Sequence, residues 1–168
     1  MGIEETLKRA EVFLGLDDSD LKQIGALSSC CEVSYESGEF IIKAGDEARY
    51  LYVLTEGQVD VVIDIPLDLK GEATRVVVDI ITKGGFFGWS ALVKPHSYVM
   101  SAVCSKPSKV AIISGSEIQA LFDREHQIGY KVFQSLSHII GNRLRDLEQV
   151  VVKGKRWPFL RSRQLSDI

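Results

Sequence analysis

The sequence predicts a mainly β domain with helices on both sides of the β block and a long helix at its C-terminal end. Short runs rich in β-branched and aromatic residues fill the middle of the chain, and Gly, Asp and Pro turn signals separate them. Apolar residues recur at helical spacing before and after this block. Many short strands with regular turns are typical of closed or double-sheet architectures such as the jelly roll, which leave few strand edges exposed.

Two short helices are expected before the β block. The first ends at Gly15 and has one apolar face, which consists of Leu7, Ala10, Phe13 and Leu14. Asp17 or Asp18 caps the second helix, which extends through Leu27. An aspartate suits this position because its side chain accepts hydrogen bonds from the free backbone N–H groups of a first helical turn.

The β block is expected to begin after Cys31 and to end before Ser114. Its strands are predicted at residues 32–35, 40–43, 50–56, 58–65, 74–81, 98–104 and 109–113. Gly45 and Gly57 permit tight hairpins, because glycine adopts positive φ without steric cost. The alternation of side chains along a strand places four apolar residues in the core, namely Leu51, Val53, Val59 and Val61.

Two more helices are expected after the β block. Ser114 or Ser116 caps a short helix through Phe122, and a longer helix runs from about Glu125 to Val151. Apolar residues of the long helix are spaced by three and four, which is the period of a two-helix coiled coil, although Arg143 interrupts them. We therefore expect a homodimer through Phe133, Leu136, Ile140, Arg143, Leu144, Leu147 and Val150. A helix packed only on its own β domain would show a similar face.

The chain is expected to form one domain, at residues 1–150, followed by a basic aromatic tail at 151–168. Trp157 and Phe159 lie among the basic residues of this tail. Such a segment can contact phosphates and stack on bases, dock on an anionic surface, or form a poorly ordered or self-packing end. Pro158 and Gly154 argue against a continued helix.

The composition is that of an ordinary globular protein. The 168 residues are 45% hydrophobic and carry a net charge of −3, which suits one full core and excludes a strongly charged tail-like protein. The apolar runs are too short to span a membrane, and the polar N-terminus is not a secretory signal. The three cysteines are Cys30, Cys31 and Cys104, an odd number without metal-ligand spacing. We expect a cytoplasmic protein with reduced thiols and no metal, and we set aside a redox role for the adjacent pair.

Several motifs together resemble the cyclic-nucleotide-binding domain, the family of the bacterial catabolite activator protein, kinase regulatory subunits and channel gating domains. The most recognisable run is Leu51–Val61, with Gly57 at its turn. Other matching residues are Phe13, Leu16 and Leu21 near the start, Gly38, Ile41 and Gly45 in the first strands, Phe87 and Gly88 later, and Leu136 to Arg145 in the long helix. The resemblance covers roughly residues 10–150. It implies a double-stranded β-helix, or jelly roll, with a long C-terminal dimerisation helix.

The resemblance also implies a ligand site after Phe87–Gly88, which we call the cassette. In the family, helix amides and an arginine bind the cyclic phosphate, and a glutamate directly after the glycine accepts from the ribose hydroxyl. Here Trp89 holds the glutamate position, and Tyr98 holds the arginine position when counted from Gly88 or from the Val110 strand. Leu147 and Glu148 fall where the bacterial activator contacts the purine. The candidate site residues are Phe87, Gly88, Trp89, Ser90, Ala91, Lys94, His96, Tyr98 and Val99.

These replacements predict weak binding of cyclic AMP or cyclic GMP, or none. A tyrosine can donate a hydrogen bond to a phosphate but cannot neutralise it. Each lost charged contact costs ~1.5–3 kcal/mol, roughly tenfold to a hundredfold in affinity. Lys94 and His96 are the residues that would supply charge from a shifted position. Trp89 and Tyr98 either fill the pocket or stack on a different planar ligand, and we favour filling.

We therefore expect a non-enzymatic regulatory or sensor module, without a cofactor other than a cyclic nucleotide or another small anionic ligand. Its protein partner is not identified by the sequence. The alternative is the effector domain of a catabolite-activator-type transcription regulator that binds a different small ligand. Direct DNA binding is not expected, because the residues after Val150 are too few for a helix-turn-helix domain. A cupin-type enzyme or a haem or iron–sulfur sensor would need clustered ligands, and His96, His126 and His138 are dispersed.

Overall fold

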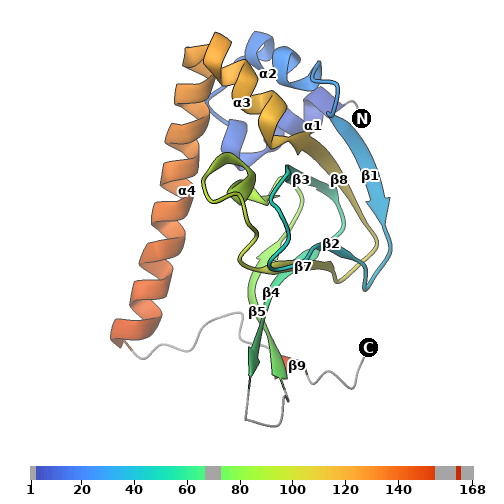
Figure 1. The fold of residues 1–168 in the computed structure, drawn as a ribbon, viewed down its shortest axis with the longest axis vertical. Coiled ribbons are helices and arrows are strands. Elements are labelled where there is room, and N and C mark those ends of the chain that lie inside the picture. The colour runs from blue at the N-terminus through green and yellow to red at the C-terminus, as the bar shows by residue number, and fades with distance from the viewer. Residues whose placement is uncertain (1–2, 67–72, 154–161, 164–168) are drawn as a thin grey trace.

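Two antiparallel sheets form the centre of the protein, in a computed structural model that describes residues 3–66, 73–153 and 162–163 (Figure 1). One sheet has the strand order β1-β8-β3-β6 and the other β2-β7-β4-β5-β9. The strands are β1 Cys31–Tyr35, β2 Phe40–Ile42, β3 Tyr50–Glu56, β4 Val59–Pro66, β5 Ala73–Ile81, β6 Phe86–Phe87, β7 Ser101–Cys104, β8 Ser108–Ser114 and β9 Ser162–Arg163. The predicted double-sheet jelly roll is thus confirmed.

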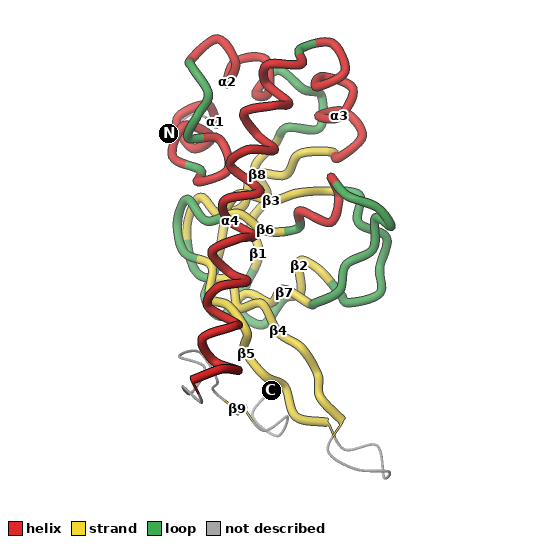
Figure 2. The backbone as a smooth tube through the Cα atoms, turned by 90° about the vertical axis from the view of Figure 1, so that its left-hand side faces the viewer, coloured by secondary structure: helices red, strands yellow, loops and turns green. Residues whose placement is uncertain are grey.

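Helices cover one end of the sheets, and the longest helix runs along the side of the β block (Figures 1 and 2). The α-helices are α1 Ile3–Arg9, α2 Asp18–Gly25, α3 Gly115–Arg124 and α4 His126–Lys153. Two short 3-10 helices are η1 Glu11–Phe13 and η2 Trp89–Leu92. The long C-terminal helix is therefore present at the predicted place, with 28 residues. Among the described residues, no helix is both long and apolar enough to cross a bilayer.

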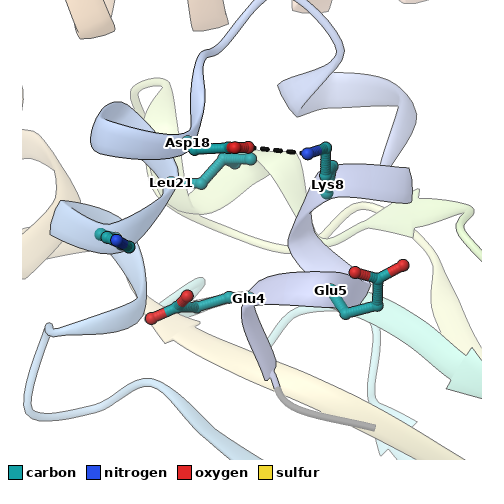
Figure 3. Close-up of a pocket in the computed structure, with 6 residues that line it drawn as sticks. Glu4, Glu5, Lys8, Asp18 and Leu21 are labelled. Carbon is teal, nitrogen blue, oxygen red and sulfur yellow. Dashed lines mark hydrogen bonds and ion pairs between the residues drawn. The ribbon is translucent and has the colours of Figure 1, made fainter.

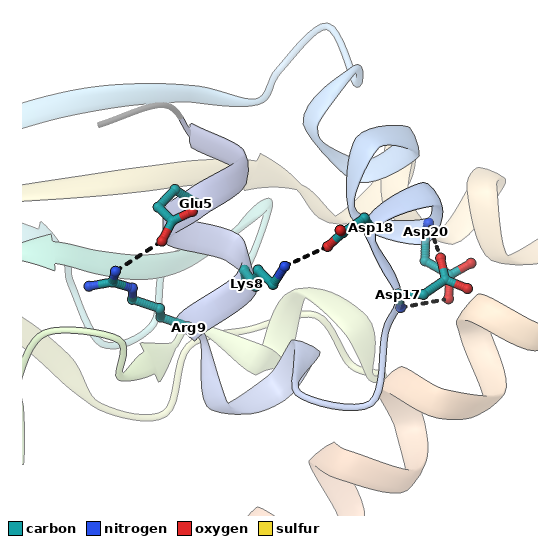
Figure 4. A network of polar contacts seen from close by, with 6 residues as sticks. All are labelled: Glu5, Lys8, Arg9, Asp17, Asp18 and Asp20. Carbon is teal, nitrogen blue, oxygen red and sulfur yellow. Dashed lines mark hydrogen bonds and ion pairs between the residues drawn. The ribbon is translucent and has the colours of Figure 1, made fainter.

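The predicted first helix is wrong in its extent, because the chain leaves the α-helix after Arg9. Ala10 has an extended backbone, and the next N–H, of Glu11, donates to the carbonyl of Gly84 at 3.3 Å. This contact with the segment before β6 redirects the chain, and Leu14 is left 69% exposed. Ion pairs tie α1 to itself and to α2, as Arg9–Glu5 and Lys8–Asp18 (Figure 4).

The two helix caps fall on one of each predicted pair of residues. Asp17 caps α2 in a capping box, because its carboxylate accepts from Asp20 N at 2.9 Å and Asp20 accepts from Asp17 N at 3.3 Å (Figure 4). Ser114 caps α3 by accepting from Glu117 N. Both contacts satisfy backbone donors that have no partner within the helix.

The predicted core positions of Leu51 and Val53 are confirmed, and strand β3 is buried on its other face as well, which the alternation did not predict. Leu51 and Val53 face what we call the outer core, between the sheet and the helices, together with Phe86, Ile113, Ile128 and Leu136. Tyr52 and Leu54 face what we call the inner core, between the two sheets, together with Val59, Phe87, Tyr98 and Val110. A strand that is buried on both faces reads as a continuous apolar run.

Glycines at positive φ make the turns that the sequence predicts. Gly45 has φ 91° and Gly57 has φ 96°. At Gly57 a Cβ atom would lie 2.4 Å from the carbonyl oxygen of Pro107, so glycine is required there for space as well as for conformation. A bulge between Val61 and Val62 shifts the register of β4 against β5, and it leaves Val61 only partly buried.

Two strands near the cassette differ from the prediction. The strand expected at 98–104 begins only at Ser101, because Tyr98 makes backbone hydrogen bonds with the turn after β2. Its N–H donates to Asp46 O at 3.0 Å, and its carbonyl accepts from Gly45 N at 2.8 Å. The short strand β6, which was not predicted, pairs with Tyr52 and Val53 of β3.

Candidate functional site

The cassette begins with a backbone turn that only glycine fits. Gly88 lies between β6 and η2 with φ 77°. A Cβ atom there would lie 2.9 Å from the carbonyl oxygen of Tyr50 and 2.9 Å from the ring of Tyr52. The glycine therefore allows the cassette to pass closely over the start of β3.

Helix η2 places its residues in two different cores. Ala91 is buried in the inner core, and Leu92 is buried in the outer core. Trp89 is half-buried and packs against the outer core, whereas Phe87 belongs to the inner core. Trp89 and Tyr98, which are expected to fill one pocket together, therefore lie in different clusters.

The ring of Tyr98 points inward, and its hydroxyl makes hydrogen bonds to backbone groups. The side chain is 7% exposed. Its hydroxyl donates to Tyr50 O at 2.6 Å and lies 3.2 Å from Tyr50 N, from which it accepts. Burial raises the pKa of Tyr98, so the group stays neutral at physiological pH. The hydroxyl is thereby engaged at the position where the resemblance implies a phosphate-binding arginine.

Tyr52 and Phe87 line the space beside Tyr98. Their rings are stacked with centroids 5.1 Å apart. Burial raises the pKa of Tyr52 strongly, and neighbouring Tyr98 adds to this effect. These side chains form a neutral aromatic wall under the cassette, which favours apolar packing over the binding of an anion.

The remaining cassette residues lie at or near the surface. Lys94 is exposed, Val99 is 74% exposed, and Ser90 is half-buried. His96 is half-buried and has φ 55°, which is uncommon for a residue with a side chain. Its carbonyl accepts from Ala48 N at 2.8 Å, which ties this loop to the turn before β3.

A pocket of about 400 Å³ lies at the junction of the turn before β3, the cassette and α3. It includes two of the predicted site residues, Ala91 and His96. Its other lining residues are Glu47, Ala48, Arg49, Tyr50, Ser114, Ser116 and Gln119. Sequence reasoning missed Gln119, whose Nε2 donates to Ala91 O at 3.0 Å, because no motif links a residue of α3 to the cassette.

A second pocket of about 210 Å³ lies between α1 and α2, on a charged surface (Figure 3). Glu4, Glu5, Lys8, Asp18, Leu21 and Lys22 line it. The Lys8–Asp18 pair, 2.7 Å between its charged atoms, joins α1 to α2 at this pocket (Figure 3). Glu5, Lys8 and Asp18 already form ion pairs, and none of the lining residues belongs to the cassette, so the pocket adds nothing to the candidate site.

The long helix divides the residues of the expected dimer seam between the core and the surface. Leu136 is 2% exposed and lies in the outer core of its own chain, and Ile140 packs against the same core. Phe133 is 39% and Leu144 is 55% exposed. Arg143 pairs with Asp79 of β5 at 3.0 Å. The side chains of Leu147, Glu148 and Val150 lie outside the described part of the structure, as does most of the tail at 151–168.

The cysteines and histidines do not gather into a site. Within the described residues, no group of three or more His, Cys, Asp or Glu side chains is placed to hold a metal ion. Burial raises the pKa of the Cys30 thiol to about 11. This thiol is therefore protonated at neutral pH, and a protonated thiol is a poor nucleophile and metal ligand.

Comparison with known proteins agrees with this architecture. The family model named cyclic nucleotide-binding domain matches residues 32–125. This stretch is more than half of the 168 residues, so the chain belongs to the cyclic nucleotide-binding domain family. The match runs from the second residue of β1 to the residue between α3 and α4, and it includes the cassette.

Two of the similar proteins are bacterial. A Rhodopseudomonas palustris protein with the provisional name of a potassium channel protein is 26% identical over 147 residues. These residues are 88% of this chain but only 33% of that protein, so the chain spans about a third of its relative. The structure of a provisionally named cyclic nucleotide-binding protein from Geobacter metallireducens is 27% identical, with TM-score 0.68, over 84% of this chain and 97% of that one.

The third relative is the regulatory subunit of a cAMP-independent protein kinase A from Trypanosoma brucei, in the structure of a triple mutant that is bound to cAMP in the A site. It is 25% identical with TM-score 0.63, over 80% of this chain and 44% of that chain. The family thus supplies regulatory binding modules to larger proteins of different activities. This chain is such a module.

Proposed function

We propose that this chain is a non-enzymatic regulatory module in signal transduction whose cassette no longer recognises cyclic AMP or cyclic GMP with ordinary affinity. The observation that supports it most directly is the hydroxyl of Tyr98, which is engaged by the backbone of Tyr50 at the position expected for the phosphate-binding arginine. Trp89, at the expected glutamate position, packs against the outer core. Two charged contacts to the ligand are then replaced by neutral packing.

The trypanosomal relative makes this proposal specific. That protein is a cAMP-independent kinase subunit, and the mutant found with cAMP bears three substitutions, one of which introduces an arginine. A family member that does not respond to cAMP can therefore exist in nature. By the same logic, an arginine at residue 98 should help to restore recognition here, whereas a glutamate at residue 89 follows from the family resemblance alone.

Isothermal titration with cyclic AMP and cyclic GMP tests the proposal. The wild-type protein is expected to release no heat at micromolar ligand. The double variant Trp89→Glu/Tyr98→Arg is expected to bind at least tenfold more tightly. It regains a carboxylate that accepts from the ribose hydroxyl and a guanidinium that neutralises the phosphate. Micromolar binding by the wild-type protein would contradict the loss of recognition.

A matched control separates charge from space. The variant Trp89→Gln/Tyr98→Met removes the same aromatic rings and introduces side chains of similar length without charge. It should fold, as judged by circular dichroism, and should not gain binding. If it gains as much as the charged variant, aromatic bulk is the cause; if neither gains, the backbone of the cassette has itself diverged.

We also propose that the module is a homodimer through α4. A stripe with alternating spacings of three and four runs along this helix, and its described members are Tyr130, Phe133, Ser137, Ile140 and Leu144. All of them are exposed except Ile140, which packs partly against the outer core. Tyr130 is 66% exposed, so the stripe offers apolar surface that its own domain does not cover. Leu136, which is expected in the dimer seam, packs inward against the outer core, so Ser137 takes its place in this stripe. A monomeric mass by light scattering at micromolar concentration would contradict the dimer.

A further inference from the structure

The pocket of about 400 Å³ beside Gln119 has no part in the proposed loss of cyclic-nucleotide recognition. Trp89, Tyr98 and Tyr52 do not line it, although its residues Ala48 and Ala91 belong to the same inner core as the two tyrosines. Its volume falls within the range of small-molecule sites, roughly 300–1,000 Å³. Small side chains create this space, because Ala48, Ala91 and Ser116 line it where larger residues would fill it.

Hydrogen bonds between the walls hold the pocket open in one shape. Gln119 Nε2 donates to Ala91 O at 3.0 Å, which joins α3 to the cassette. Gly115 N donates to Arg49 O at 2.8 Å, which joins α3 to the turn before β3. Ala48 N donates to His96 O at 2.8 Å, which joins that turn to the cassette. A pocket that is already formed costs less ordering when a ligand binds.

Glu47 and Arg49 form an ion pair at this pocket. Arg49 contacts Glu47 through Nε at 2.8 Å and Nη2 at 2.6 Å, and both nitrogens use the same carboxylate oxygen, Oε2. The structure records no partner, among the described residues, for the other carboxylate oxygen or for Nη1. The pair therefore retains both an acceptor and a donor for a ligand that carries both charges.

His96 supplies a second donor from the cassette loop, which is hydrogen-bonded to the turn that carries Glu47 and Arg49. Its φ of 55° is sustained by two backbone hydrogen bonds, from its N–H to Val93 O at 3.0 Å and from Ala48 N to its carbonyl at 2.8 Å. A residue with a side chain at positive φ is concentrated at functional sites, where the surroundings enforce the conformation. The imidazole can donate to a carboxylate in either its neutral or its charged form.

We propose that this pocket binds a small zwitterion of the α-amino acid class. The ligand carboxylate accepts from Arg49 and His96, and the ligand ammonium group donates to Glu47. A simple anion would be repelled by Glu47 and a simple cation by Arg49, so only a molecule with both charges satisfies the pair. This site does not depend on the proposed function, because neither Trp89 nor Tyr98 lines the pocket.

The affinity is expected to be low, with Kd on the order of 1 mM, because the ion pair is largely exposed and the ligand has few atoms. A bound molecule would contact the turn before β3, the cassette and α3 at once. It would therefore favour the mutual arrangement of these three elements that the structure shows. The pocket would link a metabolite to the position of the cassette without any nucleotide.

Nuclear magnetic resonance of the full chain tests the proposal, with glycine, L-serine, L-glutamate and L-arginine as the separate probes. At least one of them should cause saturable shifts of the amides of Arg49, His96, Gly115 and Gln119. Sodium acetate and methylamine, which each carry one of the two charges, should bind at least tenfold more weakly. The absence of saturable shifts up to 20-fold above the expected Kd, roughly 20 mM, or equal binding of acetate, would overturn it.

Two variants and a control locate the site. Arg49→Gln removes the cation, and Ser116→Phe fills the pocket from an exposed position; both should abolish the shifts. Arg9→Gln is the matched control, because Arg9 forms a similar exposed ion pair with Glu5 at 2.9 Å and lies outside this pocket. The control should keep the wild-type affinity. Shifts that survive in both pocket variants would place the ligand elsewhere and overturn the proposal.

Discussion

The phenol of Tyr98 is a structural latch between the cassette and the start of β3. It makes two hydrogen bonds to the backbone of Tyr50 while its ring lies in the inner core. Such a buried hydroxyl is costly to remove, because its partners lose their own contacts as well. The residue at the position expected for a phosphate-binding arginine therefore contributes to the stability of the fold.

The variant Tyr98→Phe should be less stable than the wild-type protein by about 1–2 kcal/mol in free energy of unfolding, since it keeps the ring and loses the hydroxyl. Urea denaturation followed by circular dichroism measures this difference. Tyr130→Phe is the matched control, because Tyr130 is 66% exposed, and it should change stability by less than about 0.5 kcal/mol. Equal effects of the two changes would show that the latch contributes nothing.

Glu117 provides a second test at the level of single residues. Its carboxylate accepts from the hydroxyls of Ser28 and Ser29 and from the backbone N–H of Ser29. These hydrogen bonds, that of Ser28 first, lower the pKa of Glu117 below its usual 4.5. The folded protein thus prefers the ionised form, so the contribution to stability is complete above about pH 4.5 and is lost as pH falls through the lower folded pKa.

The difference in unfolding free energy between wild type and Glu117→Gln should therefore be largest near neutral pH and should shrink in acid. Denaturation curves between pH 7 and pH 3 measure it. Ser29→Ala in the Glu117→Gln background serves as control, because without the carboxylate its effect should not vary with pH. A wild-type advantage that is constant or grows in acid would contradict the role of the ionised carboxylate.

Single positions were predicted well where one residue decides the local geometry. Gly45 and Gly57 adopt the expected positive φ, and Asp17 and Ser114 cap the expected helices. The pocket lined by Arg49 and Gln119 could not be foreseen, because its walls come together only in the folded chain. The two hydrogen bonds of the Tyr98 hydroxyl were equally invisible, since no spacing links residue 98 to residue 50.

Among the secondary-structure elements, helix α4 contains two glycines with opposite surroundings. At Gly141 no atom lies within 4 Å of an added Cβ. At Gly129 an added Cβ would lie 2.9 Å from the Cβ and 3.1 Å from the Cγ of Phe122, which belongs to α3. Gly129 thus permits the close packing of α3 on α4, whereas Gly141 only weakens the helix.

Gly141→Ala should stabilise the protein by roughly 0.5–1 kcal/mol, because alanine loses less backbone entropy in a helix. Gly129→Ala should destabilise it by at least about 1 kcal/mol, because the new methyl group overpacks the contact with Phe122. Urea denaturation at one protein concentration compares the two variants. If both substitutions stabilise, helix propensity outweighs packing and the close approach of α3 is not a constraint.

The helix boundaries show where local sequence signals stop being sufficient. The presence of the short α3 follows from its Ser114 cap, and that of α4 follows from apolar spacing. The break after Arg9 does not, because the hydrogen bond from Glu11 N to Gly84 O joins residues that are distant in the sequence. The same holds for β7, which begins late because Tyr98 bonds to the turn after β2.

At the scale of the whole molecule, the proposed dimer makes thermal stability depend on concentration. Association stabilises the folded state by mass action, so the Tm of the wild-type protein should rise between about 1 and 100 μM, and a monomer would show no such rise. Leu144→Glu places a charge in the exposed stripe and should remove this dependence. His138→Glu adds the same charge at an exposed position of the same helix outside the stripe, and should retain it. Differential scanning calorimetry measures both; equal behaviour of the two variants would contradict a dimer through the stripe.

The overall architecture could be predicted from the sequence, because the residues that form its turns and helix caps lie close together in the chain. Turns with glycine at positive φ separate the strands, and the predicted helices and strands occur in the predicted order, with β6, β9 and two 3-10 helices in addition. What the sequence did not reveal is that the apolar residues serve two cores. The apolar spacing of α4 was also ambiguous, because its residues are divided between core and surface: Leu136 packs inward while Leu144 remains exposed.

Strand β3 is the wall that the two cores share, with Leu51 and Val53 on one side and Tyr52 and Leu54 on the other. The helices rest on the first side, and the cassette closes over the second. The outer core, where the helices pack, contains none of Tyr52, Phe87 and Tyr98. Evolution can therefore change side chains on the inner face of β3 while the helices keep their contacts on the other face.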